Sequence, residues 1–196
     1  MFDQIIQYIN ILDKKTFEFI IVFLNYDFIV NTASFIVHEK KFIPYLISLY
    51  LIFLFINYKR ALLFLAAFLI LLGVSEIISS SLKSYFMRER PSAQTGILFA
   101  SANYSFPSAH AFNSMAIAWF LSFWFQSKKN IFIGLSFIIG ISRVLANYHF
   151  PFDVLAGWIG GFILGYSFQK LLFFASNQNI KRRLNAIQIS QNLSTG

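Results

Sequence analysis

The chain has 196 residues, of which 57% are hydrophobic, 19% are aromatic and only 12% are charged. A soluble domain of this length does not tolerate so apolar a composition, so an integral membrane protein with a single domain is expected. The net charge is +8, but no basic stripe with interleaved aromatic residues lies outside the apolar segments, so nucleic acid is not an expected partner. The lack of cysteine excludes disulfides and thiolate metal sites.

Charged residues interrupt the N-terminal apolar stretch before the core of a signal peptide can form, so no cleavage is expected. They are Asp3, Asp13, Lys14 and Lys15. The next stretch, Phe17–Val37, is long enough to cross a bilayer but contains Glu18 and Asp27. A charged carboxylate at the centre of a bilayer costs roughly 3 kcal/mol on insertion scales. This stretch can therefore cross the membrane, lie in its interface or pack inside the protein.

Five further apolar segments approach the ~20 residues that a helix needs to cross a bilayer. They cover about residues 42–58, 60–82, 107–126, 130–148 and 152–175. The predicted fold class is all-α, a polytopic transmembrane helix bundle, with residues 1–175 as one membrane-embedded domain. Gly157, Gly161 and Gly165 recur every four residues and predict close packing of the last segment against another helix. Residues 176–196 are polar and are expected to form a cytoplasmic tail with little fixed structure.

Basic residues between the apolar segments predict the orientation of the chain in the membrane. One side, predicted to be cytoplasmic, carries Lys59, Arg60, Lys128, Lys129, Lys170, Lys181, Arg182 and Arg183. The other side, expected to face the periplasm or the cell exterior, carries Lys83, Arg88, Arg90, His110, Arg143 and His149. Because the C-terminus is then cytoplasmic, five spans leave residue 42 outside, and a cytoplasmic Lys14 and Lys15 favour a sixth span across Phe17–Val37.

The first polar cluster on the outer side contains Lys83 and Arg90. They are seven residues apart, so on a continuous helix they share a face, and Pro91 marks the end of that helix. Glu76 lies seven residues before Lys83 and is a candidate for an ion pair or for support of Lys83. Cations at a membrane edge also occur without function, with the charged head reaching water, so this cluster is weak evidence by itself.

The second cluster is Pro107-Ser108-Ala109-His110. Proline suits the first turn of a helix, where the following amides have no helical partner and point toward any bound anion. His110 on that turn can donate a proton to a leaving group, or it can simply bond a neighbouring loop carbonyl.

The third cluster contains Ser142, Arg143, His149 and Asp153. Pro151 predicts a helix start directly after His149, which brings the carboxylate of Asp153 close enough to accept the Nδ1 proton of the imidazole. The imidazole would then have a bare Nε2 that can act as a nucleophile or a base. Arg143 can bind phosphoryl oxygens through two parallel hydrogen bonds.

Taken together, the three clusters resemble the signature of type 2 phosphatidic acid phosphatases, the membrane-bound, bacterial-type members of a superfamily that includes vanadium haloperoxidases. The resemblance covers residues 83–153, with three motifs in the family's order and spacing. It implies that His149 attacks phosphorus, that Asp153 orients His149 and that His110 protonates the leaving oxygen. It further implies a phosphate site formed by Lys83, Arg90, Ser108, the amide of Ala109, and Arg143, with Ser142 and Glu76 as candidate supporting residues.

One departure from the family pattern is Ala109, where the family usually has glycine. If the position required a positive φ, alanine would cost about 1 kcal/mol, whereas at a helical position alanine is tolerated or preferred. The expectation is the helical case.

The expected function is a lipid phosphatase that forms a phosphohistidine and needs no metal or other cofactor. Candidate substrates are a polyprenyl diphosphate, a lipid A 1-phosphate, phosphatidylglycerol phosphate and phosphatidate, hydrolysed at the outer face of a bacterial cytoplasmic (inner) membrane. Besides its lipid substrate and membrane lipids, no obligate protein partner is expected.

Three alternatives remain: a lipid phosphotransferase of the same fold, a lipid-phosphate binding or transport protein, and a metal site built from His110, His149 and Asp153. The last is disfavoured because nearby Lys83, Arg90 and Arg143 would repel a cation.

Overall fold

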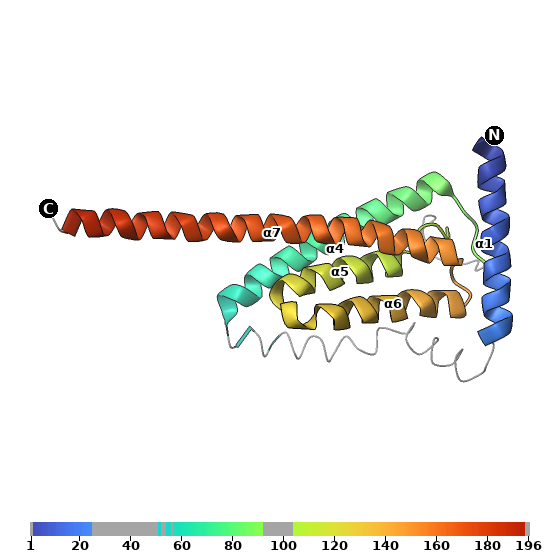
Figure 1. Ribbon diagram of the computed structural model, residues 1–196, viewed down its shortest axis with the longest axis horizontal. Coiled ribbons are helices and arrows are strands. Elements are labelled where there is room, and N and C mark those ends of the chain that lie inside the picture. The colour runs from blue at the N-terminus through green and yellow to red at the C-terminus, as the bar shows by residue number, and fades with distance from the viewer. Residues whose placement is uncertain (1, 25–50, 52–53, 56, 92–103, 195–196) are drawn as a thin grey trace.

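The computed structural model describes residues 2–24, 51, 54–55, 57–91 and 104–194 (Figure 1). These residues form helices, and no strand occurs among them. The elements are α1 (Phe2–Leu24), α4 (Tyr58–Phe86), α5 (Ala109–Trp124), a short 3₁₀ turn η3 (Gln126–Lys128), α6 (Lys129–Leu145) and α7 (Pro151–Ser194). The predicted all-α class is confirmed for the described part of the chain.

Helix α5 lies at the centre of the bundle, in contact with α4, α6 and α7 (Figure 1). Its buried residues Ala116 and Phe120 pack against Leu71 of α4, and partly buried Phe68 and Phe168 extend this cluster from α4 and α7. Helix α1 lies across the end of the bundle where α7 begins and contacts both α6 and α7. The N-terminal helix therefore meets the bundle at one end.

Three glycines of α7 bring its backbone against that of α5, as the four-residue spacing predicts. A Cβ atom on Gly157 would lie 2.6 Å from the carbonyl oxygen of Ser108, and one on Gly165 would lie 2.7 Å from that of Ala116. A Cβ on Gly161 would overlap the carbonyl of Phe112. Only glycine permits this approach, which aligns the first turns of α5 and α7.

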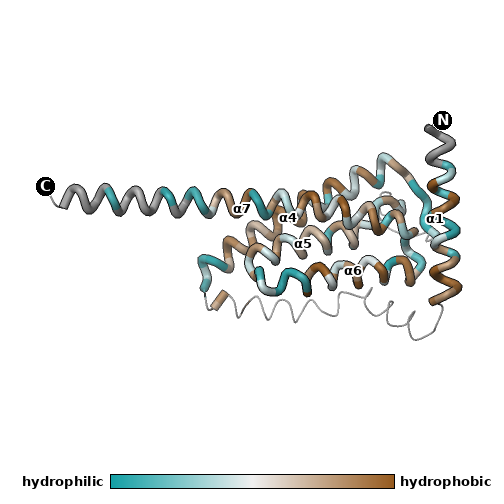
Figure 2. Tube along the Cα trace, viewed as in Figure 1, coloured by the Kyte–Doolittle hydropathy of each residue, from teal (hydrophilic) through white to brown (hydrophobic). Residues whose placement is uncertain are grey.

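Many large apolar side chains of the bundle are exposed, as expected for helices in contact with lipid. Examples on α4 and α7 are Leu63, Ile77, Ile159 and Ile163. Hydrophobic residues recur along the bundled helices α4 to α7 (Figure 2). Two helical segments are long and apolar enough to cross a membrane, Tyr58–Phe86 and Pro151–Gln178. Helices α5 and α6 have 16 and 17 residues and lie within the segments predicted at about 107–126 and 130–148.

The number of spans stays a prediction. Most of the segment at about 42–58 and the part of Phe17–Val37 beyond Leu24 fall outside the described residues.

The expectation of little fixed structure after residue 175 is wrong, because α7 continues without interruption to Ser194. The reason is the local sequence: no glycine or proline occurs between Gly165 and Gly196, and Leu, Ala, Lys, Arg and Gln favour helix. Polarity alone therefore does not end this helix. Its C-terminal part extends beyond the other helices (Figure 1).

Candidate active site

The end of α4 provides the first group of the site. Met87 ends the helix in the left-handed conformation, with φ 46°, and its amide donates to the carbonyl of Lys83 at 2.9 Å. Lys83 lies in the last turn, buried, and its Nζ donates to the carbonyl of Tyr104 at 3.1 Å. Arg90 follows the helix end, so the prediction that Lys83 and Arg90 share one helix face is wrong. The turn at Met87 instead redirects the chain toward the α6–α7 connection, where Arg90 Nη1 donates to the carbonyl of Tyr148 at 3.3 Å.

The N-terminus of α5 provides the second group. The helix begins at Ala109, and Ser108 is its N-cap residue, so Pro107 precedes the helix and does not lie in its first turn. Ala109 is not among the described non-glycine residues with positive φ, which confirms the expectation that alanine is tolerated here. The buried Ser108 Oγ has no hydrogen-bond partner in the described chain, and the first amides of a helix lack internal acceptors. This helix start is suited to an anion.

The connection between α6 and α7 holds His149. The carbonyl of Arg143, in the last turn of α6, accepts the amides of Tyr148 and His149 at 3.0 and 3.3 Å. Asn147 has φ 60°, a left-handed conformation that asparagine tolerates better than most residues. The tight turn leaves His149 only 2% exposed, and α7 begins at Pro151 as predicted.

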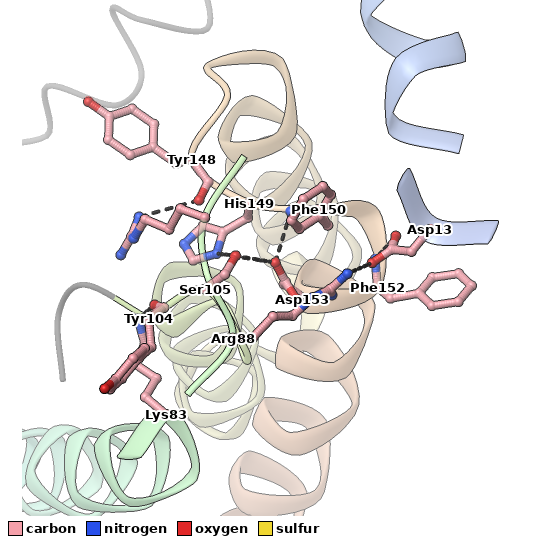
Figure 3. A network of polar contacts seen from close by, with 11 residues as sticks. Asp13, Lys83, Arg88, Tyr104, Ser105, Tyr148, His149, Phe150, Phe152 and Asp153 are labelled. Atoms are coloured by element: carbon pink, nitrogen blue, oxygen red, sulfur yellow. Dashed lines mark hydrogen bonds and ion pairs between the residues drawn. The ribbon is translucent and has the colours of Figure 1, made fainter. Parts of the chain in front are cut away.

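Ser105 lies between His149 and Asp153 (Figure 3). The Ser105 hydroxyl donates to Asp153 Oδ2, and its oxygen lies 3.4 Å from His149 Nδ1. The direct distance from His149 Nδ1 to Asp153 Oδ2 is 3.8 Å, longer than a hydrogen bond. The predicted direct contact is therefore replaced by a relay in which Nδ1–H donates to the serine and the serine donates to the carboxylate. This arrangement leaves Nε2 as the bare nitrogen.

The Asp153 carboxylate is fully buried and accepts further hydrogen bonds. The Phe150 amide donates to Oδ2 at 2.8 Å, and Arg88 Nη1 donates to Oδ1 at 2.6 Å. The backbone carbonyl of Asp153 accepts the amide of Ser108 at 2.9 Å, so α5 and α7 are joined at their first turns. These contacts keep the carboxylate in one orientation.

Burial lowers the pKa of His149 to about 4. The interaction with Asp153 opposes this effect, and the nearby cations Arg90 and Lys83 add to it. Both cations lie near the imidazole, because Arg90 donates to the carbonyl of Tyr148, the residue before His149, and Lys83 donates to the carbonyl of Tyr104, the residue before Ser105. At neutral pH the imidazole is uncharged, the form that can attack an electrophile.

The other predicted residues lie at the same end of the bundle or close to it. His110 is half-buried on the first turn of α5, and Arg143 is buried in the last turn of α6. Ser142 donates to the carbonyl of Ile139 in its own helix at 2.7 Å. Glu76 is exposed and accepts from Ser80 at 3.1 Å, whereas Lys83 donates to Tyr104, so Glu76 and Lys83, both described by the structure, form no ion pair.

Three residues of the network were not predicted as site residues: Ser105, Arg88 and Asp13. Arg88 stood out only as one of several outer cations, and Ser105 lies three residues before the predicted Ser108 motif. Asp13 lies 140 positions before Asp153, so no local pattern connects the two.

The alternative of a metal site built from His110, His149 and Asp153 is not supported. In the part of the chain that the structure describes, no group of three or more His, Cys, Asp or Glu side chains could hold one ion. The carboxylate of Asp153 is paired with Arg88 instead.

Comparisons with known proteins identify relatives of this chain. The chain is 34% identical over 128 residues to phosphatidylglycerophosphatase B of Bacillus subtilis (strain 168), an alignment that covers 58% of each protein. It is similar in structure to LpxE of Aquifex aeolicus, with a TM-score of 0.61 and 26% identity over 81% of this chain and 95% of that one. It is also similar to a transmembrane PAP2-type phosphatidylglycerolphosphate phosphatase from Bacillus subtilis, with a TM-score of 0.62 and 25% identity over 86% of this chain and 87% of that one. The family model of the PAP2 superfamily matches residues 61–177, which contain the site apart from Asp13, and the chain therefore belongs to the PAP2 superfamily.

Proposed function

We propose that this protein is an integral membrane phosphatase that hydrolyses the phosphate monoester of a lipid through a phosphorylated His149. The observation that carries the proposal is the buried, neutral imidazole whose Nδ1 faces the Ser105–Asp153 relay, at the same end of the bundle as a helix N-terminus and several cations. The names of the relatives support it, although the chain aligns with only 58% of the length of the Bacillus phosphatidylglycerophosphatase.

The phosphate group would bind among fixed positive groups. Lys83, Arg90 and Arg143 supply the charge, and the amide of Ala109 and the hydroxyl of Ser108 supply hydrogen bonds at the start of α5. No group among the described residues bonds the buried Ser108 Oγ, which makes it a ready donor for a phosphoryl oxygen. Charge that develops on the phosphoryl oxygens in the transition state is stabilised by such donors without reorganisation.

In the first step, Nε2 of His149 would attack phosphorus, forming the N–P bond as the bond between phosphorus and the lipid oxygen breaks. His110 would donate a proton to that oxygen, which leaves as the lipid alcohol. The imidazole becomes cationic in this step, and the Asp153 carboxylate stabilises it through Ser105. In the second step, His110 would take a proton from water, which attacks phosphorus, breaks the N–P bond and releases inorganic phosphate.

The location of the site supports a lipid substrate. The candidate spans Tyr58–Phe86 and Pro151–Gln178 each carry a site residue in their first or last turn, Lys83 and Asp153. A headgroup could enter there while its hydrocarbon chains remain beside the exposed apolar helices. We assign this end to the periplasmic or exterior face of a bacterial cytoplasmic membrane, and the C-terminal end of α7 to the cytoplasm, on the distribution of basic residues.

The test is phosphate release by the purified full-length chain in detergent micelles. The substrates are phosphatidylglycerol phosphate, phosphatidate, a polyprenyl diphosphate and lipid A 1-phosphate, each offered without a second lipid. We expect turnover of phosphatidylglycerol phosphate and loss of turnover in His149→Ala. Parental turnover by that variant would refute the nucleophile assignment, and no phosphate release from any substrate would refute hydrolysis.

A further inference from the structure

Helix α1 reaches the site from outside the part of the chain that defines the family. The family match begins at residue 61, whereas α1 ends at Leu24. Asp13, in the middle of α1, is nevertheless fully buried (0% exposed). A buried carboxylate needs partners that offset its desolvation. Those partners belong to the network around Asp153 (Figure 3).

Asp13 is joined to the site by two contacts. Its Oδ1 accepts the amide of Phe152, in the first turn of α7, at 3.0 Å. Its Oδ2 lies 2.8 Å from Arg88 Nη2, while Nη1 of the same guanidinium lies 2.6 Å from Asp153 Oδ1. One arginine therefore bridges two carboxylates, one from α1 and one from α7.

Aromatic contacts hold the bridge in place. The Arg88 guanidinium lies over the ring of Phe150 at 4.4 Å from its centroid. Phe17, one turn after Asp13 on α1, packs edge-on against the same ring at 5.3 Å. Phe150, which connects His149 to α7, and the first turn of α7 thus contact both α1 and Arg88.

We propose that Asp13 is a positioning residue for the reaction, acting through Arg88 and Asp153 on His149. The inference rests on the proposed function. An arginine paired with Asp153 alone could adopt several geometries, whereas carboxylates at both terminal nitrogens of the guanidinium, Asp153 at Nη1 and Asp13 at Nη2, select one. The negative charge of Asp13 also weakens the attraction between Arg88 and Asp153, because one cation is shared between two anions. The Asp153 carboxylate is then not pulled away from the Ser105 hydroxyl.

The direct test is Asp13→Asn, which keeps the shape of the side chain and the acceptor for the Phe152 amide but removes the charge. We expect kcat to fall by about tenfold or more, as is typical when support for a reactive side chain is removed, with KM within about twofold of the parent. The matched control is Glu18→Gln, which neutralises an exposed acid on the same helix and should leave both constants unchanged. Parental kcat in Asp13→Asn would overturn the proposal.

A double-mutant cycle separates positioning from a general structural effect. If Asp13 acts through Asp153, adding Asp13→Asn to Asp153→Asn should reduce kcat no further. Full additivity of the two losses would overturn the proposal. If Asp13→Asn does not yield folded protein, Asp13→Glu replaces it, since the longer side chain keeps the charge but shifts the carboxylate relative to Arg88 and the Phe152 amide. A lower kcat at unchanged KM supports the proposal, and parental kcat refutes it.

The same assays distinguish this inference from the proposed function. A parent enzyme that is active and depends on His149, together with a fully active Asp13→Asn, would refute the positioning role and leave the phosphatase intact. A parent that releases no phosphate from any lipid of the panel would refute both.

Discussion

Replacement of Ser105 by alanine tests the relay between His149 and Asp153. The hydroxyl is fully buried, donates to Asp153 Oδ2 and lies 3.4 Å from His149 Nδ1. Alanine removes it with almost no change in volume, and Asp153 keeps its bonds to Phe150 and Arg88. The carboxylate therefore stays in place, but the Nδ1 proton of His149 loses its acceptor.

The magnitude follows from that lost acceptor. A buried donor left without a partner costs about 1–3 kcal/mol. This cost grows as the imidazole becomes cationic during attack on phosphorus, so it is felt mainly in the transition state. At about 1.4 kcal/mol for each factor of ten, Ser105→Ala should lower kcat by roughly 5- to 140-fold. KM should change little, because the hydroxyl does not face the phosphate site.

The assay is steady-state phosphate release, with thermal unfolding measured in the same detergent. The control is Ser136→Ala, which removes an equally buried hydroxyl that lies 2.9 Å from Ser114 Oγ between α5 and α6. We expect this variant to keep parental activity. The reasoning is refuted if Ser105→Ala retains kcat within twofold of the parent, or if both variants lose activity to the same extent.

Three further predictions concern protonation, packing and metal dependence. Because burial lowers the pKa of His149 to about 4, its imidazole should stay neutral as the pH falls through 6.5 and gain a proton only near pH 4. An NMR titration of the three labelled histidines measures this, and His149→Gln assigns the signal. A midpoint near pH 6.5 for His149 would contradict the prediction. Gly157→Ala should lower both thermal stability and activity, because its Cβ would lie 2.6 Å from the Ser108 carbonyl oxygen. The control Gly73→Ala, whose Cβ would have nothing within 4 Å, should be neutral or stabilise α4 by up to about 1 kcal/mol. Equal melting temperatures for Gly157→Ala and the parent would argue against the close contact between α5 and α7. Phosphate release should persist in excess EDTA, since Lys83, Arg90 and Arg143 supply the positive charge, and a loss restored by Mg²⁺ would refute that assignment.

Local patterns predicted the elements that hold the site with good accuracy. Pro151 marked the start of α7, the glycine spacing marked its close contact with another helix, and the all-α class of the described residues followed from the long apolar segments. The errors arose at helix ends. The left-handed turn at Met87 places Arg90 outside α4, a conformation that methionine does not signal in sequence.

The sequence by itself determined the class of protein and the family motifs, because hydrophobic run length and the spacing of Lys83, His110, His149 and Asp153 are local properties of the chain. The tertiary structure alone decided how the imidazole is oriented. Ser105 enters between His149 and Asp153, and Arg88 joins Asp153 to Asp13 on α1, because helices distant in sequence converge at one end of the bundle. Contacts between residues up to 139 positions apart depend on how helices pack, and no periodicity within one helix records them.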